Sequence, residues 1–319
     1  MWRRPWTYRE GSALAAGLLV VGTMLQLSVG PIYWQLFAWP VNIIVLAAFA
    51  LAMLTIYALR RKAYALRFFT TVQAAVPALA VAAGLTVVMG LTRQYTGKPT
   101  AGQTTLDPLG LTRMLSAWPF VLVYLYMTVI VAQVTIRQTM HLRWRVIPSL
   151  VCHVGLLVVL LCGTLGSADM RRLKMVCEVR RPEWRAADER GNIVELPLAI
   201  EMKRFILEEY PSEVTGEPDT TGIERVRRDP KRFASDIQIF TKSGLNIKAT
   251  VDVNKPVTVE GWKIYQYGYD QAKGAQTDIS IFELVSDPWM PAVYVGIYLL
   301  LAGAVALFLI PQPGKEGAS

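Results

Sequence analysis

The chain has 319 residues, of which 53% are hydrophobic and only 18% are charged. Its mean hydropathy is +0.34, which is too apolar for an ordinary water-soluble enzyme of this size. The formal net charge of +9 is compatible with nucleic-acid binding only if the basic residues gather on one folded surface. The composition therefore favours a membrane protein.

Six hydrophobic stretches are each close to the ~20 residues needed to cross a ~30 Å hydrocarbon core. Five of them fall within residues 1–166, and the sixth opens the segment 289–319, which ends in a polar tail. The stretches lie at about 11–29, 41–59, 68–91, 118–136, 146–166 and 289–310. The sequence thus predicts an α-helical polytopic membrane protein with six transmembrane helices.

The excess positive charge lies on one side of these predicted helices. Eleven basic and two acidic residues occupy the N-terminal segment, the loops 60–67 and 137–145, and the segment after Pro311, whereas the rest of the chain carries no net charge. Since positively charged loops stay in the cytoplasm, we expect both termini to be cytoplasmic and residues 167–288 to be extracytoplasmic. This distribution gives no support to a nucleic-acid partner.

Polar side chains within the first five stretches predict contacts between helices. Gln26, Gln73 and Gln133 lie in three different stretches and are expected to hydrogen-bond between them. In the third stretch Ala74, Ala78 and Ala82 recur every four residues. Such a stripe of small side chains allows a neighbouring helix to approach closely.

The pattern of apolar and polar residues predicts a β-rich domain over residues 167–288. Residues 245–252 alternate between apolar and polar side chains, as in a strand with one buried face. Similar runs occur at 198–202 and near 173–179, 235–241, 262–267 and 278–285. The segment Glu208–Arg232 mixes acids, bases, Pro and Gly without period, so we expect a long loop there. Asp287-Pro288 is typical of the start of the last helix.

The region 254–269 carries a turn signal followed by an aromatic run. Asn254 favours a turn and Pro256 cannot donate to a sheet ladder, so a strand break is expected at these residues. Tyr265, Tyr267 and Tyr269 then follow at alternate positions and are predicted to share one strand face. Packing in a core or on a surface is the favoured interpretation of that face, and a surface for haem or an apocytochrome is the alternative.

The chain has only two histidines, and His153 lies inside the fifth predicted helix. An ionisable side chain is energetically costly inside a membrane, so its presence there calls for a structural or functional explanation. Two interpretations stay open: a neutral imidazole bonded to another helix, or a ligand or proton relay. A neutral imidazole is a good axial ligand for haem iron. His141 cannot supply the second axial ligand, because the helical rise between the two is ~18 Å. A haem held by His153 therefore needs a ligand from a partner chain.

Three arginines lie between the fourth and fifth predicted helices. Arg137, Arg143 and Arg145 could pair with haem propionates, because a guanidinium matches a carboxylate in bidentate fashion. The positive-inside rule explains the same residues without any ligand. Both interpretations stay open.

Other signatures of chemistry are missing. No GxGxxG, phosphate loop, HExxH or GxSxG motif occurs, and two histidines are too few for a multi-histidine metal centre. Cys152, Cys162 and Cys177 are too few for a disulfide scaffold. Neither CxxC nor CxxCH occurs, so the chain is not expected to shuttle thiols by itself or to carry covalent haem.

Four stretches, in this order, resemble the ResB/CcsB family over about residues 118–310: Trp118-Pro119-Phe120, then His153-Val154-Gly155-Leu156-Leu157, then Val253–Pro256 with Gly261–Asp270, then Ser286–Trp289. The resemblance implies a subunit of the system II cytochrome c biogenesis machinery in the bacterial inner membrane. That machinery moves haem b across the membrane and joins it to the CxxCH thiols of apocytochrome c. The chain departs from the four-helix form of the family by two further helices at its N-terminus.

The resemblance also implies roles for residues and partners. His153 matches the family's membrane histidine, which helps to bind haem. The implied partners are a CcsA-like membrane protein with a tryptophan-rich haem-handling segment, apocytochrome c and a thioredoxin-like thiol reductant. This chain would be a non-catalytic or co-catalytic subunit of a haem lyase. The alternative is a membrane scaffold or sensor whose outer domain binds a protein and whose histidine is merely packed. A transporter is disfavoured, because no inverted repeat is evident.

Overall fold

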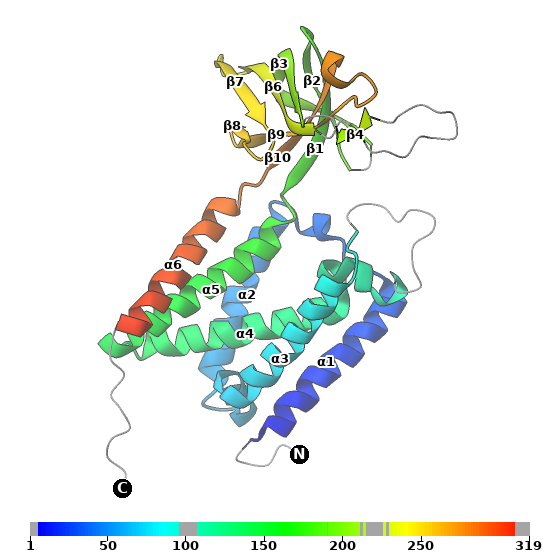
Figure 1. Cartoon of the computed structure of the whole chain (residues 1–319). Coiled ribbons are helices and arrows are strands. Elements are labelled where there is room, and N and C mark those ends of the chain that lie inside the picture. The colour runs from blue at the N-terminus through cyan, green and yellow to red at the C-terminus, as the bar shows by residue number, and fades with distance from the viewer. Residues whose placement is uncertain are drawn as a thin grey trace. The chain divides into compact units, whose positions relative to one another are not determined.

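The computed structural model divides the chain into two compact units, a helical unit and a β unit (Figure 1). The helical unit comprises Met1–Asp169 and Pro288–Ser319, and the β unit comprises Met170–Asp287. The residues that the structure describes are 6–95, 107–189, 191–210, 213–214, 226–227 and 230–309. The β unit follows the fifth long helix and precedes the sixth, which confirms the predicted fold class.

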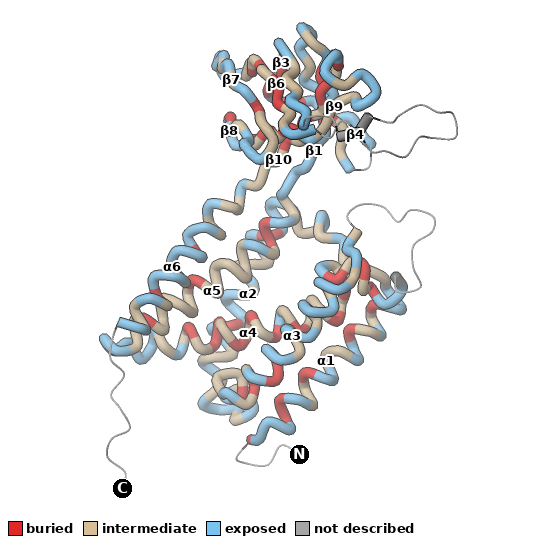
Figure 2. Tube along the Cα trace, viewed as in Figure 1, coloured by how far each residue is buried: buried red, intermediate tan, exposed pale blue. Residues whose placement is uncertain are grey.

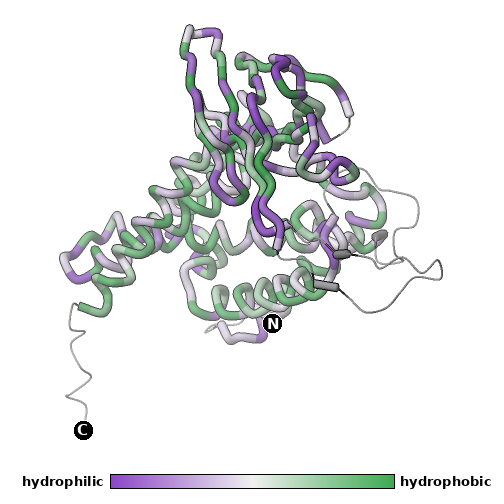
Figure 3. The backbone as a smooth tube through the Cα atoms, turned by 45° about the horizontal axis from the view of Figure 1, so that its top comes forward, coloured by the Kyte–Doolittle hydropathy of each residue, from purple (hydrophilic) through white to green (hydrophobic). Residues whose placement is uncertain are grey.

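Within the described residues, six helices of 19 to 23 residues are long and apolar enough to cross a membrane. They are α1 (Tyr8–Val29), α2 (Val41–Leu59), α3 (Val72–Leu91), α4 (Trp118–Met140), α5 (Ile147–Gly166) and α6 (Met290–Leu309). Figure 3 shows them coloured mainly as hydrophobic. The third helix begins at Val72 because Tyr64–Thr70 form a 3-10 helix, η2, before it. The sixth begins at Met290, so Asp287 and Pro288 precede the helix.

Helix α4 is the centre of the helical unit. In the most apolar 18-residue stretch of α4, 39% is buried, against 11–17% in the corresponding stretch of each of the other five helices. Figure 2 shows buried positions along α4. It contributes to an apolar cluster with the chain's start, η2 and α3, made of Trp6, Phe68, Ala74, Ala78, Tyr126 and Ile130. Ala74 and Ala78 are fully buried, which confirms the predicted contact stripe for these two alanines.

Two of the three predicted glutamine contacts form. The backbone N–H of Trp118 donates to Oε1 of Gln26 over 3.3 Å, and Nε2 of Gln133 donates to the carbonyl of Met53 over 2.8 Å. These bonds join α1 to the start of α4 and α4 to α2. Away from water each such bond satisfies a polar group that would otherwise be costly.

Helices α5 and α6 pack backbone against backbone through glycines. A Cβ added at Gly155 would lie 2.5 Å from the backbone nitrogen of Leu300, and one added at Gly303 would lie 2.6 Å from that of Cys152. Gly296 faces the carbonyl oxygen of Gly155 in the same way. No larger side chain fits at these positions, so the close approach depends on glycine.

The β unit is an eight-stranded antiparallel sheet in the order β7-β6-β3-β2-β1-β10-β9-β8. The strands are β1 (Arg171–Glu178), β2 (Pro182–Ala187), β3 (Ile193–Glu209), β6 (Pro230–Thr241), β7 (Asn246–Asp252), β8 (Val257–Val259), β9 (Trp262–Tyr269) and β10 (Ile279–Ser286). One face of the sheet packs a core that includes Met175, Ile200, Met202, Ile239, Ile264, Phe282 and Leu284. The alternation predicted for 245–252 is confirmed, since Val251 is buried and its neighbours are less so.

The prediction of a loop over Glu208–Arg232 is wrong at both ends, where the chain forms strands. Strand β3 continues to Glu209 and β6 begins at Pro230, and these two residues pair. Arg232 bonds Glu208 over 2.7 Å and Asp252 over 2.8 Å, so the mixed charges are cross-strand partners. Two short strands, β4 (Glu213–Val214) and β5 (Val226–Arg227), also pair. The rest of this predicted loop lies outside the described residues.

The prediction that Tyr265, Tyr267 and Tyr269 share one face is wrong. The register of β9 against β10 shifts by a bulge, so that Tyr265 pairs with Glu283 whereas Tyr269 pairs with the buried Ser280. A bulge adds one residue to a strand and reverses the alternation beyond it. Tyr269 therefore turns to the core face, while Tyr267 is 51% exposed.

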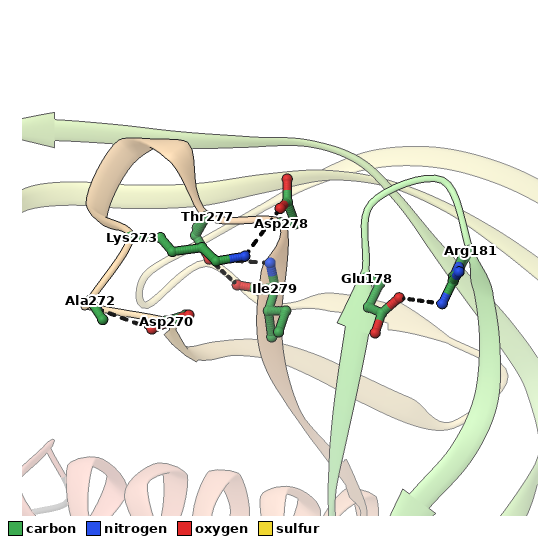
Figure 4. A network of polar contacts seen from close by, with 8 residues as sticks. All are labelled: Glu178, Arg181, Asp270, Ala272, Lys273, Thr277, Asp278 and Ile279. Carbon is green, nitrogen blue, oxygen red and sulfur yellow. Dashed lines mark hydrogen bonds and ion pairs between the residues drawn. The ribbon is translucent and has the colours of Figure 1, made fainter.

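The turns of the β unit follow the predicted chemistry. Asn254 has a φ of 62°, a left-handed conformation that Asn tolerates, and Lys255 N donates to the carbonyl of Asp252 over 3.0 Å. Between β9 and β10, Asp270 accepts from the backbone of Ala272 and Lys273 pairs with Asp278 over 3.3 Å (Figure 4). These are exposed braces of a loop, and such ion pairs contribute little stability.

Candidate functional site

His153 is held in one orientation by its own helix. It lies one turn after Ser149 on α5, and its Nδ1 is 2.6 Å from the carbonyl oxygen of Ser149. A carbonyl can only accept, so Nδ1 carries the proton in this hydrogen bond. The neutral ring then has its lone pair on Nε2, and no hydrogen bond joins Nε2 to any described residue. A nitrogen in this state is suited to bind a metal or accept a proton.

A polar contact from α4 supports the same turn of α5. Nε2 of Gln138 donates to Oγ of Ser149 over 3.0 Å, and that hydroxyl lies 3.4 Å from Nδ1 of His153. Oε1 of Gln138 is buried without a hydrogen-bond partner among the described residues. The spacing of Ser149 from His153, one helical turn, is a signal in the sequence that could have revealed this contact.

The side chains around His153 are apolar and partly exposed. His153 and its neighbours Leu156 and Leu157 are all half-buried, and only 11% of the most apolar stretch of α5 is buried within the structure. Cys152, the preceding residue, faces α6: its Sγ lies 3.6 Å from the carbonyl oxygen of Leu300. The imidazole thus lies on a flank of α5 that the α6 contact leaves uncovered.

The sequence-predicted arginines lie at the end of the helix that carries His153. Arg143 and Arg145 are exposed on either side of Trp144, and neither makes an ion pair with a described carboxylate. Arg137 donates to the carbonyl of Thr70 over 3.3 Å. His141 is exposed at the C-terminal end of α4. Within the part of the chain that the structure describes, no hydrogen bond joins His153 to any of these residues.

Within the described residues there is no cluster of three or more His, Cys, Asp and Glu side chains that could hold a metal ion. His153 therefore belongs to no such cluster. A six-coordinate haem iron needs an axial ligand on each face of the ring. Through Nε2, His153 can supply one of these two ligands.

Further along the same pair of helices, Tyr124 on α4 donates to the carbonyl of Leu160 over 2.8 Å and accepts from the hydroxyl of Thr164 over 2.9 Å. These bonds and the Gln138–Ser149 bond join α4 to α5 near both ends. The α4 contacts therefore fix the rotation of α5, and with it the direction of His153.

Asp169, which sequence reasoning missed, ties three parts of the helical unit together. Its Oδ1 accepts from the backbone N–H of Trp39 over 2.7 Å, and its Oδ2 accepts from Nδ2 of Asn42 and from Nε1 of Trp289, each over 2.7 Å. Trp289 also packs on Gly166, where a Cβ would lie 2.4 Å from that of the tryptophan. The Asp169 carboxylate therefore joins the end of α5 to the starts of α2 and α6.

The one cysteine of the β unit is not a reactive thiol. Cys177 is fully buried on β1, and burial, with a smaller contribution from the nearby Glu183, raises the pKa of its thiol to about 12. A thiol attacks only as the thiolate. Cys177 is consequently a core residue, and the chain contributes no thiol chemistry from it.

These observations define a class: a multi-pass membrane protein with an antiparallel β unit between its fifth and sixth helices and a single oriented histidine in the fifth. A family model described as "ResB-like family" matches residues 139–282, and this match confirms the resemblance found in the sequence. The matched part contains His153 and most of the β unit.

Among solved structures, the chain is similar to one titled "Cytochrome c Heme Lyase CcmF", with 15% sequence identity and a TM-score of 0.35. The similarity covers 83% of this chain and 45% of that chain, so the chain spans less than half of its length. A comparison with curated proteins finds no match.

Proposed function

We propose that this chain is a ResB/CcsB-like subunit of a system II cytochrome c maturation complex in the bacterial inner membrane. In this proposal it helps to carry haem across the membrane and to present it for attachment to apocytochrome c outside. The observation that carries the proposal is the orientation of His153, whose Nδ1 is bonded to the carbonyl of Ser149. That bond leaves Nε2 as the nitrogen that would bind the haem iron.

The surroundings fit such a cargo. An axial imidazole is most effective when its second nitrogen donates to a backbone carbonyl, because this fixes the tautomer and the direction of the ring. The half-buried apolar side chains around His153 suit a porphyrin face. With one ligand from this chain, the second would come from a CcsA-like partner.

Arg143 and Arg145 are proposed to hold the haem propionates. Both guanidinium groups are exposed at the end of α5 that leads to His153, and neither is neutralised by a described carboxylate. A guanidinium binds a carboxylate through two parallel hydrogen bonds. The two arginines would therefore orient the porphyrin relative to His153 without contributing to covalent chemistry.

The β unit is proposed to bind the partner and apocytochrome c, with both termini of the chain on the cytoplasmic side. Because Cys177 is buried and its pKa is raised, reduction of the apocytochrome thiols would fall to a separate thioredoxin-like protein. The chain itself would act as a non-catalytic or co-catalytic subunit.

The test is to co-express the full chain with a CcsA-like partner and to record the haem spectrum of the purified pair. His153→Ala should lower the haem content, and added imidazole should restore part of it by replacing the missing ligand. Cys152→Ala is the matched control, because Cys152 is adjacent in sequence but faces α6. Unchanged haem content in His153→Ala, with the complex intact, would remove His153 from the mechanism.

The scaffold or sensor alternative makes the opposite prediction. If the hydrogen bond to Ser149 merely satisfies a packed imidazole, the complex would hold no haem and cytochrome c would mature normally after His153→Ala. Measuring cytochrome c in whole cells alongside the spectrum distinguishes the two functions.

A further inference from the structure

Four arginines from three elements converge on one hollow of the helical unit. Arg60 follows the end of α2, Arg61 is the next residue, Arg67 lies in η2 and Arg137 lies in the last turn of α4. Together with Thr70 they line a hollow of about 330 Å³. This group, the arginine hollow, is separate from His153 and does not rest on the function proposed above.

The positive charge of the hollow is not compensated within the described chain. Residues 55–75 and 130–146 contain no Asp or Glu, and none of the four arginines forms an ion pair with a described carboxylate. Like charges that are gathered in a small space repel one another and raise the local potential for an anion. An arginine cluster without acids therefore favours an anionic ligand.

Three of the four side chains are held in place by uncharged groups. Nε of Arg67 donates to the carbonyl of Arg60 over 3.0 Å, Nη1 of Arg137 donates to the carbonyl of Thr70 over 3.3 Å, and the guanidinium of Arg60 lies 3.6 Å from the centre of the Tyr57 ring. Each contact uses a small share of the five N–H donors of a guanidinium. The side chains are positioned while most donors and the full charge stay available.

The positive-inside rule accounts for arginines in such loops but not for their convergence. Charges that serve only topology need to be near the membrane surface, and they need not meet from separate elements around one space. Arg143 and Arg145 illustrate the difference, because they line no part of the hollow.

We propose that the arginine hollow binds a phosphate group, with the headgroup of an anionic phospholipid as its ligand in the membrane. Guanidinium groups match phosphate oxygens in bidentate fashion. The hollow lies at helix ends, where headgroups are found, and basic pockets between helices on the cytoplasmic side bind such lipids. A bound headgroup would bridge α2, η2 and α4 and stabilise the central helix against its neighbours.

The test uses the full chain in a neutral detergent and measures retention of short-chain phosphatidylglycerol by native mass spectrometry, with phosphatidylcholine for comparison. Phosphatidylglycerol should bind more tightly, and Arg61→Gln/Arg67→Gln should weaken it by about tenfold or more, since each basic residue contributes ~1 kcal/mol. Arg143→Gln/Arg145→Gln removes the same charge outside the hollow and should change binding less than about twofold.

Inorganic phosphate added as a competitor identifies the source of the ligand. Displacement of the lipid by phosphate supports a site for the phosphate group alone, and retention of the lipid supports a site that also needs its glycerol or acyl chains. Equal binding of the two lipids, or equal losses in the two double variants, overturns the proposal. If the first double variant folds poorly, Arg61→Gln alone should still weaken binding about fivefold, and unchanged binding overturns the proposal.

Discussion

The contacts of Asp169 predict that one carboxylate stabilises the arrangement of three helices. Asp169→Ala removes the acceptor of three hydrogen bonds, each of 2.7 Å, from Trp39, Asn42 and Trp289. The donors from Trp39, Asn42 and Trp289 would then lose their partner at the ends of α2 and α6. The change should destabilise the helical unit without altering the β unit.

The magnitude follows from the number and type of bonds. A hydrogen bond to a charged group contributes ~1.5–3 kcal/mol when buried, and the half-buried position of Asp169 reduces this to roughly 1 kcal/mol for each bond. Asp169→Ala should therefore cost about 3 kcal/mol, which corresponds to a fall of roughly 6–12 °C in melting temperature. Trp289→Phe removes one bond and keeps most of the ring, so about 1 kcal/mol is expected.

The assay is thermal unfolding of the detergent-solubilised chain, followed by its tryptophan fluorescence and by the fraction that stays monodisperse. Ser167→Ala is the control, because the exposed hydroxyl of Ser167 bonds only the carbonyl of Thr164 in its own helix. Two results would refute the reasoning: Asp169→Ala that melts with the wild type, or Trp289→Phe that costs as much as Asp169→Ala.

Three further predictions concern packing and charge. Gly303→Leu should separate α5 from α6 and lower the yield of folded protein, measured by size-exclusion chromatography, whereas Gly163→Ala should have no effect because a Cβ there meets nothing within 4 Å. Tyr269→Ala should lower the free energy of unfolding, measured by chemical denaturation, by ~3 kcal/mol. The reason is that the centre of its ring lies 4.9 Å from that of Phe205 and 5.2 Å from that of Phe233. Tyr267→Ala should lower it much less. Hydrogen bonds from Arg185 lower the pKa of Glu183 to about 2, so the stability that Glu183→Gln removes should be present at neutral pH and should vanish as the pH falls from the carboxyl's ordinary pKa towards 2.

The helices were predictable because each one satisfies a length and composition requirement that no other segment meets. Twenty apolar residues cross a hydrocarbon core whatever their neighbours are. The start of α3 at Val72 was not predictable in this way, since Phe68 and Phe69 are as apolar as a membrane helix. They belong to η2 because Phe68 is buried against Trp6 and Tyr126, a tertiary contact that hydropathy does not contain.

The strands were predictable from alternation only where each paired regularly. Alternation failed at Tyr269, because a bulge is a property of two strands and the sequence of one strand does not reveal it. Alternation gave no signal at the ends of the expected loop, because charged residues, Pro and Gly mix there without an apolar period. Glu208 and Arg232 form an ion pair across β3 and β6, so a segment without an apolar period still forms paired strands.

His153 was identifiable from the sequence because a histidine within an apolar helix is rare, but its usable nitrogen was not. That depends on a side-chain rotamer, on the carbonyl of Ser149 and on Gln138 from another helix. Cys152 and His153 show the consequence most clearly, because adjacent residues point about 100° apart around a helix. Cys152 meets the glycine face of α6, and His153 is thereby left on a flank that α6 does not cover. The packing that joins α5 to α6 thus turns the imidazole away from α6, onto the side of α5 where Ser149 meets Gln138 of α4.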